Sequence, residues 1–356
     1  MPTCQVRLLA AVALLVAANT VVGLPSSTYA DDGGASDRRA VKVIADQRLT
    51  VTNVVGTGAF PLYVSADWTQ PLPDITRAVV VFHGKLRNAD VYHRSAMSAL
   101  AAAGEAGHAT LLITPQFLTP ADVAAHKLPD AMLRWRGTAW MGGEPALAPA
   151  RLSSFDAIDA IVARLADRSL YPKLTQVIVA GHSGGGQFVQ RYAVVGQGEA
   201  ALREAGVQIR YVIANPSSYV YFNEDRPRPD GTVAPFKAAD CAGFNLWKYG
   251  MDDKHAYAAE KSSEEIERDY ARRDVIYLLG TRDINPNHPA LDKSCEAEAQ
   301  GRHRFARDHA YFDYVRNRNQ REFKHRLYDV AGVGHQGGKM LKSPCGLAAL
   351  FGNAQC

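Results

Sequence analysis

The chain has 356 residues, of which 47% are hydrophobic and 21% charged, and its formal net charge is +4. This length is enough for one large α/β domain or two small ones. So mild a charge argues against a nucleic-acid partner, because such partners are bound by a concentrated basic surface.

The first 30 residues have the pattern of an export signal. Arg7 precedes an apolar run over residues 8–18, and small residues lead up to Asp31. The run is short for a membrane span and is interrupted by polar residues, which favours cleavage over a membrane anchor. We therefore expect a signal peptide at residues 1–30, a disordered lead-in at 31–40 and one domain at 41–356. We also expect a secreted or periplasmic protein with no stable membrane insertion.

The first half of this domain alternates between predicted strands and helices. Loosely alternating residues at 41–55 and 60–68, with GTG between them, predict two antiparallel strands at a sheet edge. The apolar runs at 78–82 and 110–114 predict buried strands, and residues 91–103 between them predict a helix. This order of elements predicts an α/β sheet.

A long irregular segment at residues 115–150 interrupts the alternation and contains Trp135 and Trp140. Loops of this length in a compact domain are usually functional or disordered, and tryptophans argue against disorder. Because the loop leaves the carboxyl edge of the sheet, we predict that both tryptophans line a ligand cleft. Packing of the loop itself explains them equally well. Ser153 and Asp156 then predict the capped start of a helix.

The most informative stretch is QVIVAGHSGGGQFVQRYAVV at residues 176–195. A β-branched run leads into GHSGGG, and apolar residues then recur at helical spacing. Strand, serine between glycines, and helix are the parts of a nucleophile elbow, in which Ser183 occupies a sharp turn and Gly181 and Gly185 let strand and helix pass closely. A phosphate-binding loop is excluded because Gln187 stands where that motif requires lysine.

From about residue 77 onward the chain resembles a secreted serine hydrolase of the α/β-hydrolase superfamily. The resemblance implies a mostly parallel central sheet with helices on both faces. It also implies that the HGKL segment at residues 83–86 follows the third strand and donates an oxyanion N–H. The donors would then be the backbone of Lys85 (or Leu86) and of Gly184. HGKL departs from the HGGG of many esterases, which leaves open which N–H points inward.

After a strand at residues 209–214, residues 219–262 lose the α/β rhythm. In the superfamily this position, after the sixth strand, commonly holds a cap, so the resemblance implies a small lid, and we group its Trp247 with the substrate-binding candidates. Ser262 and Glu265 predict a capped helix after it. A helix at about 302–316 is rich in basic residues, which we interpret as a solvated face.

The acid and the base follow in the order that the resemblance requires. VIYLLGTRD at 275–283 is a strand, a glycine and then an aspartate, which makes Asp283 the expected triad acid. The spacing after it imitates a calcium loop but lacks that loop's glycine and glutamate, so we reject a calcium site. His335 lies in a glycine-rich loop after the last strand and is the expected base. His303, His309 and His325 lie among charges and are expected to be solvated.

Four cysteines remain after the signal: Cys241, Cys295, Cys345 and Cys356. An even number in an exported protein favours two disulfides, and we prefer Cys241–Cys295 and Cys345–Cys356 among three pairings. A zinc site is the alternative, but no metal-ligand spacing accompanies these cysteines. We expect neither a metal nor a cofactor.

These patterns predict a serine hydrolase that cleaves a small-molecule or polymeric carboxylic ester through an acyl-enzyme. An amidase or peptidase with the same Ser183, Asp283 and His335 is the alternative. A non-catalytic binding protein that retains the fold is a further alternative, which an intact triad disfavours.

Overall fold

The computed structural model describes residues 39–352, together with Met1 and Cys356. The predicted signal peptide beyond Met1, and the predicted lead-in up to residue 38, lie outside the described residues. All the elements below belong to the unit Asp31–Cys356. Within the described part of the chain, no helix has the length and apolar character that crossing a membrane requires.

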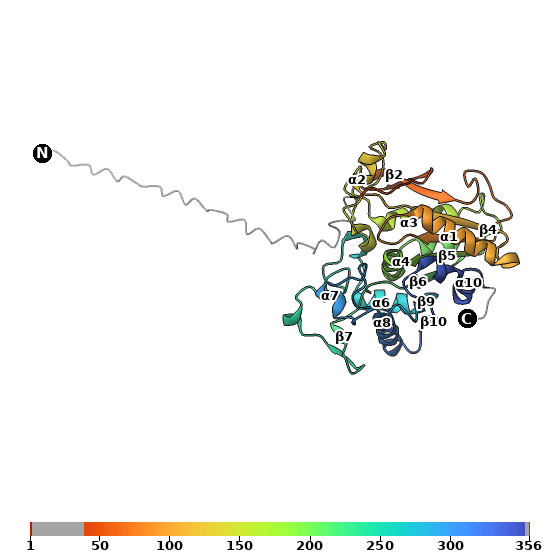
Figure 1. The fold of residues 1–356 in the computed structure, drawn as a ribbon. Coiled ribbons are helices and arrows are strands. Elements are labelled where there is room, and N and C mark those ends of the chain that lie inside the picture. The colour runs from red at the N-terminus through yellow and green to blue at the C-terminus, as the bar shows by residue number, and fades with distance from the viewer. Residues whose placement is uncertain (2–38, 353–355) are drawn as a thin grey trace. The chain divides into compact units, whose positions relative to one another are not determined.

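An eight-stranded sheet is the centre of the described domain (Figure 1). Its spatial order is β1-β2-β4-β3-β5-β6-β9-β10. The β1–β2 and β2–β4 pairs are antiparallel, and all other neighbours in the sheet are parallel. The strands are β1 Gln47–Asn53, β2 Gly56–Val64, β3 Arg77–Phe82, β4 Thr110–Pro115, β5 Gln176–His182, β6 Gln208–Ala214, β9 Val275–Gly280 and β10 Arg326–Val330.

The predicted first hairpin exists, but its turn lies earlier than expected. Asn53 pairs with Gly56, so the reversal falls at Val54 and Val55 and the predicted GTG linker belongs to β2. The apolar character of Val54 and Val55 suggested strand, yet both side chains are exposed at the tip. Gly56 has a φ of 143°, a conformation that glycine permits, and this sets the turn.

Helices cover both faces of the sheet. Successive residues of each strand point to opposite faces, so each strand packs against both groups of helices. Val79 and Val81 of β3 pack in the cluster that includes α1 (Ala89–Ala102), α9 (Gly337–Lys342) and α10 (Pro344–Phe351). Val80 and Phe82 pack in the cluster that includes α3, α4, α6 and α8. The helices in this second group are α3 Ser154–Leu165, α4 Gly184–Val195, α6 Ser263–Arg272 and α8 Arg304–Arg318.

Shorter elements fill the connections. The long segment after β4 contains α2 (Pro120–Ala125) and a 3₁₀ turn, η2 (Ala139–Gly142), and is thus more regular than expected. The remaining short elements are η1 Gly104–Gly107, α5 Glu199–Glu204, β7 Asp225–Pro227, β8 Val233–Pro235, η3 Ala238–Asp240, η4 Ala256–Ala258 and α7 Cys295–Glu298.

Local signals in the sequence set several helix ends. Ser153 and Asp156 form the predicted capping box at the start of α3, and Ser262 and Glu265 form the one at α6. Each box satisfies backbone N–H groups that have no partner within the helix.

Both preferred disulfides are present. Cys241 is bonded to Cys295, and Cys345 is bonded to Cys356. The first joins the segment after β6 to α7, and the second closes the end of the chain onto α10.

Candidate active site

Ser183 occupies the turn between β5, which ends at His182, and α4, which begins at Gly184. Its φ of 60° and ψ of −120° are unusual for a residue with a side chain and cost of order 1–3 kcal/mol. The backbone holds it there, because its N–H donates to the carbonyl of Ala214 at 2.9 Å and its own carbonyl accepts from Gln187. The result is a serine presented at the carboxyl edge of the sheet.

The flanking glycines allow the strand and the helix to pass at close range. A Cβ atom on Gly181 would lie 2.2 Å from the carbonyl oxygen of Gly185, and one on Gly185 would lie 2.4 Å from that of Phe82. Both obstacles are backbone atoms, which cannot move aside cheaply. The predicted turn therefore has the close contacts for which an elbow needs glycine.

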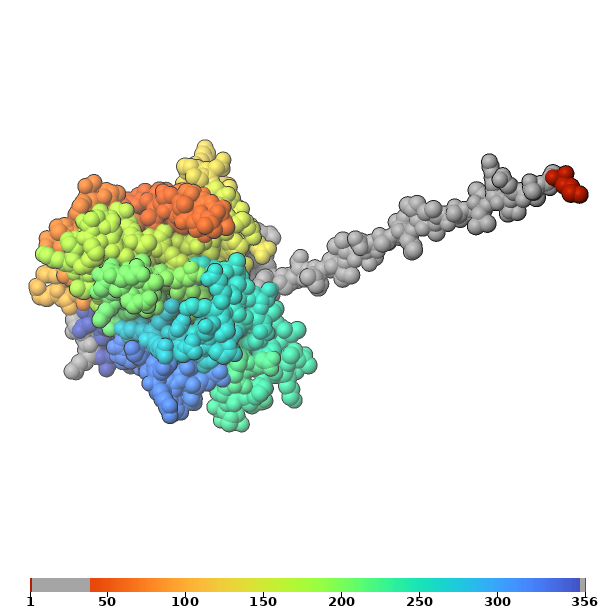
Figure 2. Space-filling model, turned by 180° about the vertical axis from the view of Figure 1, so that it is seen from behind, coloured from red at the N-terminus to blue at the C-terminus, as the bar shows by residue number. Residues whose placement is uncertain are grey.

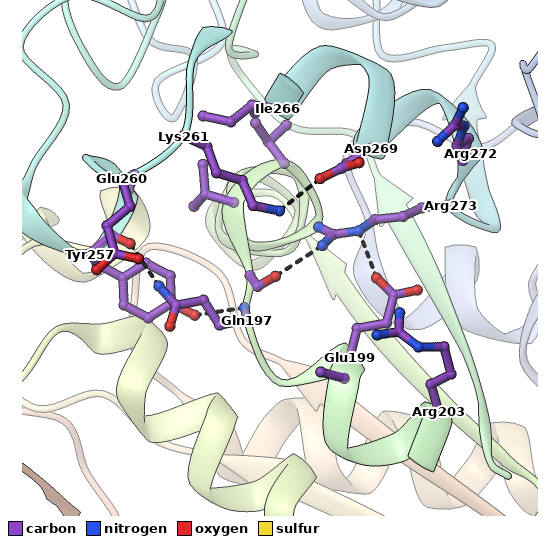
Figure 3. A pocket seen from close by; sticks show the side chains of 15 residues that line it. Gln197, Glu199, Arg203, Tyr257, Glu260, Lys261, Ile266, Asp269, Arg272 and Arg273 are labelled. Atoms are coloured by element: carbon purple, nitrogen blue, oxygen red, sulfur yellow. Dashed lines mark hydrogen bonds and ion pairs between the residues drawn. The ribbon is translucent and has the colours of Figure 1, made fainter. Parts of the chain in front are cut away.

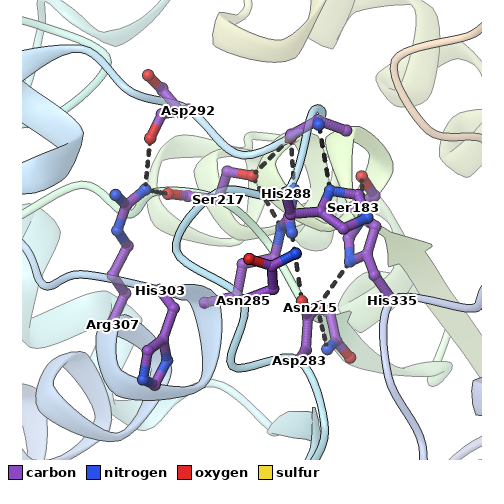
Figure 4. Close-up of polar contacts among 12 residues, drawn as sticks. Ser183, Asn215, Ser217, Asp283, Asn285, His288, Asp292, His303, Arg307 and His335 are labelled. Carbon is purple, nitrogen blue, oxygen red and sulfur yellow. Dashed lines mark hydrogen bonds and ion pairs between the residues drawn. The ribbon is translucent and has the colours of Figure 1, made fainter.

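Asp283 and His335 reach the same edge of the sheet from neighbouring strands. Val330 at the end of β10 pairs with Gly280 at the end of β9, so the loops that carry His335 and Asp283 start side by side. His335 Nε2 lies 2.8 Å from Ser183 Oγ, and His335 Nδ1 lies 2.7 Å from Asp283 Oδ2 (Figure 4). The three side chains thus form one continuous line of hydrogen bonds.

The electrostatics of this line keep Asp283 ionised and His335 neutral. Burial alone would raise the pKa of Asp283, but hydrogen bonding to His335, the Arg304 cation and the amide of Asn215 lower it to about 2. Burial lowers the pKa of His335 below its ordinary value, against the opposing effect of Asp283. A neutral imidazole beside a carboxylate has the protonation state that a general base requires.

Two backbone segments meet beside Ser183. A Cβ atom on Gly84 would lie 3.6 Å from Ser183 Cβ, and one on Gly184 would lie 2.9 Å from the backbone nitrogen of Lys85. The backbone of Lys85 and that of Gly184, two of the predicted oxyanion donors, therefore lie close together.

His83 fixes the segment that carries Lys85. Its Nε2 accepts from the N–H of Phe117 at 3.0 Å, so its Nδ1 carries the proton that is donated to the carbonyl of Gly84 at 2.9 Å. Burial lowers the pKa of His83 to about 4, which keeps the ring neutral. Hydrogen bonds of the His83 ring therefore hold the turn after β3 in a fixed conformation.

Solved structures show the same architecture. Poly(aspartic acid) hydrolase-1 from Sphingomonas sp. KT-1 matches with a TM-score of 0.59 and 21% identity, covering 86% of this chain and 98% of that one. LpqC, a poly(3-hydroxybutyrate) depolymerase from Bordetella parapertussis, matches with a TM-score of 0.58 and 20% identity, covering 90% and 96%. The chain has the α/β-hydrolase fold. Neither a family model nor a curated protein matches the sequence.

Within this α/β-hydrolase fold, the three tryptophans predicted to line a cleft are packing residues. Trp135 and Trp140 are fully buried, and Trp247 is 1% exposed. Trp135 and Trp140 pack around Phe117, with the Trp140 ring stacked on it at 4.6 Å. The cleft prediction for these residues is therefore replaced by the packing alternative, because the loop folds its indoles inward.

The predicted lid segment, residues 219–262, is part core and part surface. Its first residues, Tyr219 to Phe222, are buried and pack against tyrosines of α8. Parts of the remainder reach the surface, green to cyan in Figure 2, whereas others, such as Trp247, are buried. Trp247 Nε1 and His255 Nε2 both bond to the carbonyl of Gly142, so this part packs on η2, whose Met141 approaches Gly184.

Two polar groups on Asp283 were not predicted from the sequence. Asn215 Nδ2 donates to Oδ2 at 2.7 Å, and Arg304 Nη1 lies 3.3 Å from Oδ1. Asn215 follows the last residue of β6 at the carboxyl edge of the sheet, which is a signal that it belongs to the site. Arg304 gave no such signal, because it lies in the charged helix interpreted as solvated.

That interpretation of α8 is wrong for its first turn. Arg304 and Arg307 are fully buried, and His303 is nearly so. His303 Nδ1 accepts from the N–H of Ala306 and caps the helix. His325 is also buried, bonded to the carbonyl of Tyr270, whereas His309 is at the surface beside Asp329 as expected.

Other parts of the described structure offer no competing centre. Among the described residues, the grouping of metal-ligand side chains is Cys241, Cys295 and Glu296, and the disulfide occupies both sulfurs. A cavity of about 520 Å³ is lined by Val194 and Val195, at the end of α4 opposite Ser183. Figure 3 shows the charged side chains that line it. Its charged walls are largely paired, with Arg273 on Glu199 and Lys261 on Asp269.

Proposed function

We propose that the protein is a serine hydrolase that cleaves carboxylic esters through an acyl-enzyme. The hydrogen-bonded line from Ser183 through His335 to Asp283 carries this proposal. The fold supports it as a scaffold, since the chain order serine, acid, histidine is the one that α/β-hydrolases use.

In the proposed reaction Ser183 Oγ attacks the ester carbonyl while His335 Nε2 takes its proton. Asp283 holds the imidazole in the tautomer with Nδ1 protonated and stabilises the imidazolium that forms. The N–H groups of Gly184 and Lys85 stabilise the oxyanion, and each such donor is worth about 3 kcal/mol of transition-state stabilisation. His335 then protonates the leaving alcohol, and water releases the acyl group by the same steps.

An amide substrate is the second candidate, because the two compared structures differ in the bond they act on. Poly(3-hydroxybutyrate) is linked by esters, whereas poly(aspartic acid) is linked by amides. The same side chains serve either bond, so the choice between the two candidates rests on rates. Because both compared proteins are named for polymers, polymeric substrates are candidates here alongside small esters.

The test combines labelling with turnover. Wild type should react with a fluorophosphonate and hydrolyse p-nitrophenyl acetate, and Ser183→Ala should do neither. The exposed Ser169→Ala is the matched control and should behave as wild type. Labelling that persists in Ser183→Ala would show that the nucleophile is misassigned.

Rates on matched ester and anilide substrates distinguish an esterase from an amidase. Release of monomers from poly(3-hydroxybutyrate) and poly(aspartic acid) tests whether the protein acts on polymers. A faster anilide would reverse the proposed preference. A folded wild type that neither reacts nor turns over any of these substrates would favour a non-catalytic role.

A further inference from the structure

Arg304 is a buried cation in a position that is unfavourable for a cation. It is the first residue of α8, where the helix dipole is positive, and its side chain is fully buried. Moving a guanidinium out of water is costly unless charge and hydrogen bonds compensate. The compensating contacts therefore show what holds this residue in place.

The hydrogen bonds that Arg304 makes with the described residues lie around Asp283. Nη1 pairs with Asp283 Oδ1 at 3.3 Å, Nε donates to Ser217 Oγ at 3.0 Å, and Nη2 donates to the carbonyl of Ala290. Ser217 follows β6, and Ala290 belongs to the loop that carries Asp283. The guanidinium thus ties the acid to two segments beside it.

Asp283 is the ionised partner in this cluster. Two further carboxyls act on Arg304: Asp308, which lies one turn along α8 and is fully buried, and Asp292. Burial raises the pKa of Asp308 well above its ordinary value, and its Oδ1 accepts the hydroxyl of Tyr219. With Asp308 neutral, Asp283 is the carboxylate that bonds directly to Arg304, and Asp292 adds to the attraction.

We propose that Arg304 is a positioning residue for the triad acid, and that its charge sets the lower pH limit of the reaction by disfavouring protonation of His335. This inference rests on the proposed function. It extends the triad by one residue, which acts through Asp283 and does not touch Ser183.

Among the titratable groups around His335, Arg304 is the buried cation whose charge opposes protonation of the ring. Asp283 bonds to His335 directly, and Arg304 pairs with Asp283. The ring centroids of His182 and His288 lie 4.6 and 4.9 Å from that of His335, and Tyr92 bonds to His182. The exposed Arg282 lies near Gly334. Burial lowers the pKa of both His182 and His288, and His288 adds to the repulsion on His335 only when it is itself protonated.

The sign of the effect follows from these charges. A protonated His335 cannot accept the proton of Ser183, so activity falls as pH drops through the pKa of His335. Arg304 lowers that pKa by repulsion, and it also offsets part of the attraction from Asp283. Removing the cation should therefore raise the pKa of His335 and move the acid limb of the rate profile to higher pH.

The experiment compares Arg304→Met with Arg304→Lys and with Arg307→Gln. Arg307 is an equally buried arginine on the next turn, but its bonds go to backbone carbonyls of Gly301, Ser217 and Asp292 and not to Asp283. For each folded variant, kcat/KM for p-nitrophenyl acetate is measured against pH. The protonation of His335 is followed independently by NMR.

Arg304→Met should move the acid limb and the NMR midpoint upward by about one pH unit, because a buried cation next to the pair is lost. Arg304→Lys should keep the limb near wild type, and Arg307→Gln should not move it. A limb unchanged in Arg304→Met, or moved as far in Arg307→Gln, would overturn the proposal.

If Arg304→Met does not fold, Arg304→Lys decides, since a limb displaced while the charge is kept would also overturn it. The NMR titration needs no turnover. Failure of the proposed ester hydrolysis is thereby distinguished from failure of the role of Arg304.

Discussion

His335 Nδ1 lies 2.7 Å from Oδ2 of Asp283, and that same oxygen accepts the amide of Asn215 at 2.7 Å. With Arg304 Nη1 on its other oxygen, the carboxylate faces three donors, which hold it against the ring. This fixes the His335 tautomer that leaves Nε2 as an acceptor toward Ser183.

Replacing Asp283 by Asn should lower kcat about 10⁴-fold while the protein remains folded. An amide in place of the carboxylate can donate to Nδ1, which favours the wrong tautomer and leaves Nε2 unable to accept a proton. Steady-state ester hydrolysis measures kcat, and circular dichroism checks that the variant is folded.

Asp292→Asn is the matched control, since Asp292 is also a buried carboxyl but is bonded to Tyr249 and Ser294. It should keep kcat within a few-fold of wild type. A comparable loss in both variants would mean that Asp283 acts through the fold and not through His335.

Replacing Gly184 by Ala should lower kcat by about 10²–10³-fold with little change in KM, because the added methyl intrudes on the proposed oxyanion site. It would lie 2.9 Å from the nitrogen of Lys85 and 2.5 Å from Met141 Cε. Gly142→Ala is the control, since its added methyl has no neighbour nearer than 3.6 Å.

The Met141 contact offers a further check. Combining Gly184→Ala with Met141→Ala relieves the side-chain clash but leaves the methyl against Lys85. The double variant should stay slow. Recovery of the wild-type rate would show that the damage came from Met141 and not from the oxyanion site.

Replacing Trp135 by Ala should reduce the free energy of unfolding by about 3–5 kcal/mol and leave KM nearly unchanged. The indole is fully buried between Phe60 and Phe117, and its Nε1 donates to the carbonyl of Glu144. Urea unfolding and ester kinetics are measured on the same samples. A large rise in KM without loss of stability would restore the idea of a cleft-lining residue.

The sequence predicted those features that depend on neighbouring residues. The elbow needs glycines two positions either side of Ser183, and a capping box needs Ser153 three residues before Asp156, so each is visible locally. The positions of Asp283 and His335 were visible because both follow buried strands, whose carboxyl ends meet at one edge of a parallel sheet.

Features that depend on distant partners were not predictable in this way. The charges of α8 look alike in the sequence, and only the packing of the helix against the Asp283 loop separates buried Arg304 from the exposed residues. The tryptophans of the loop after β4 were similarly ambiguous, because an apolar side chain suits a cleft and a core equally until its neighbours are known.

Asp159 on α3 predicts a pH-dependent stability. Its Oδ1 accepts from Tyr192 and Gly198, and its Oδ2 accepts from Tyr257, which lies in the segment predicted to be a lid. Burial raises the pKa of Asp159 to about 6, although these hydrogen bonds oppose the shift. The folded state therefore prefers the protonated carboxyl more strongly than the unfolded state does.

For a carboxyl with a raised folded pKa, the stabilisation is complete below the unfolded pKa, near 4, and is lost as pH rises through about 6. A shift of about two units corresponds to about 3 kcal/mol. The wild type should thus lose up to about that much free energy of unfolding between pH 4 and 7, relative to Asp159→Asn, which cannot ionise.

Urea unfolding of both proteins across this range measures the difference, and all other titrating groups cancel in the comparison. Asp167→Asn is the control, because Asp167 is exposed and its pKa is lowered by Ser169, so any trend it causes must have the opposite sign. If the difference in free energy of unfolding between wild type and Asp159→Asn does not change with pH, this carboxyl is solvated. The link through Tyr257 would then not hold the segment to α3.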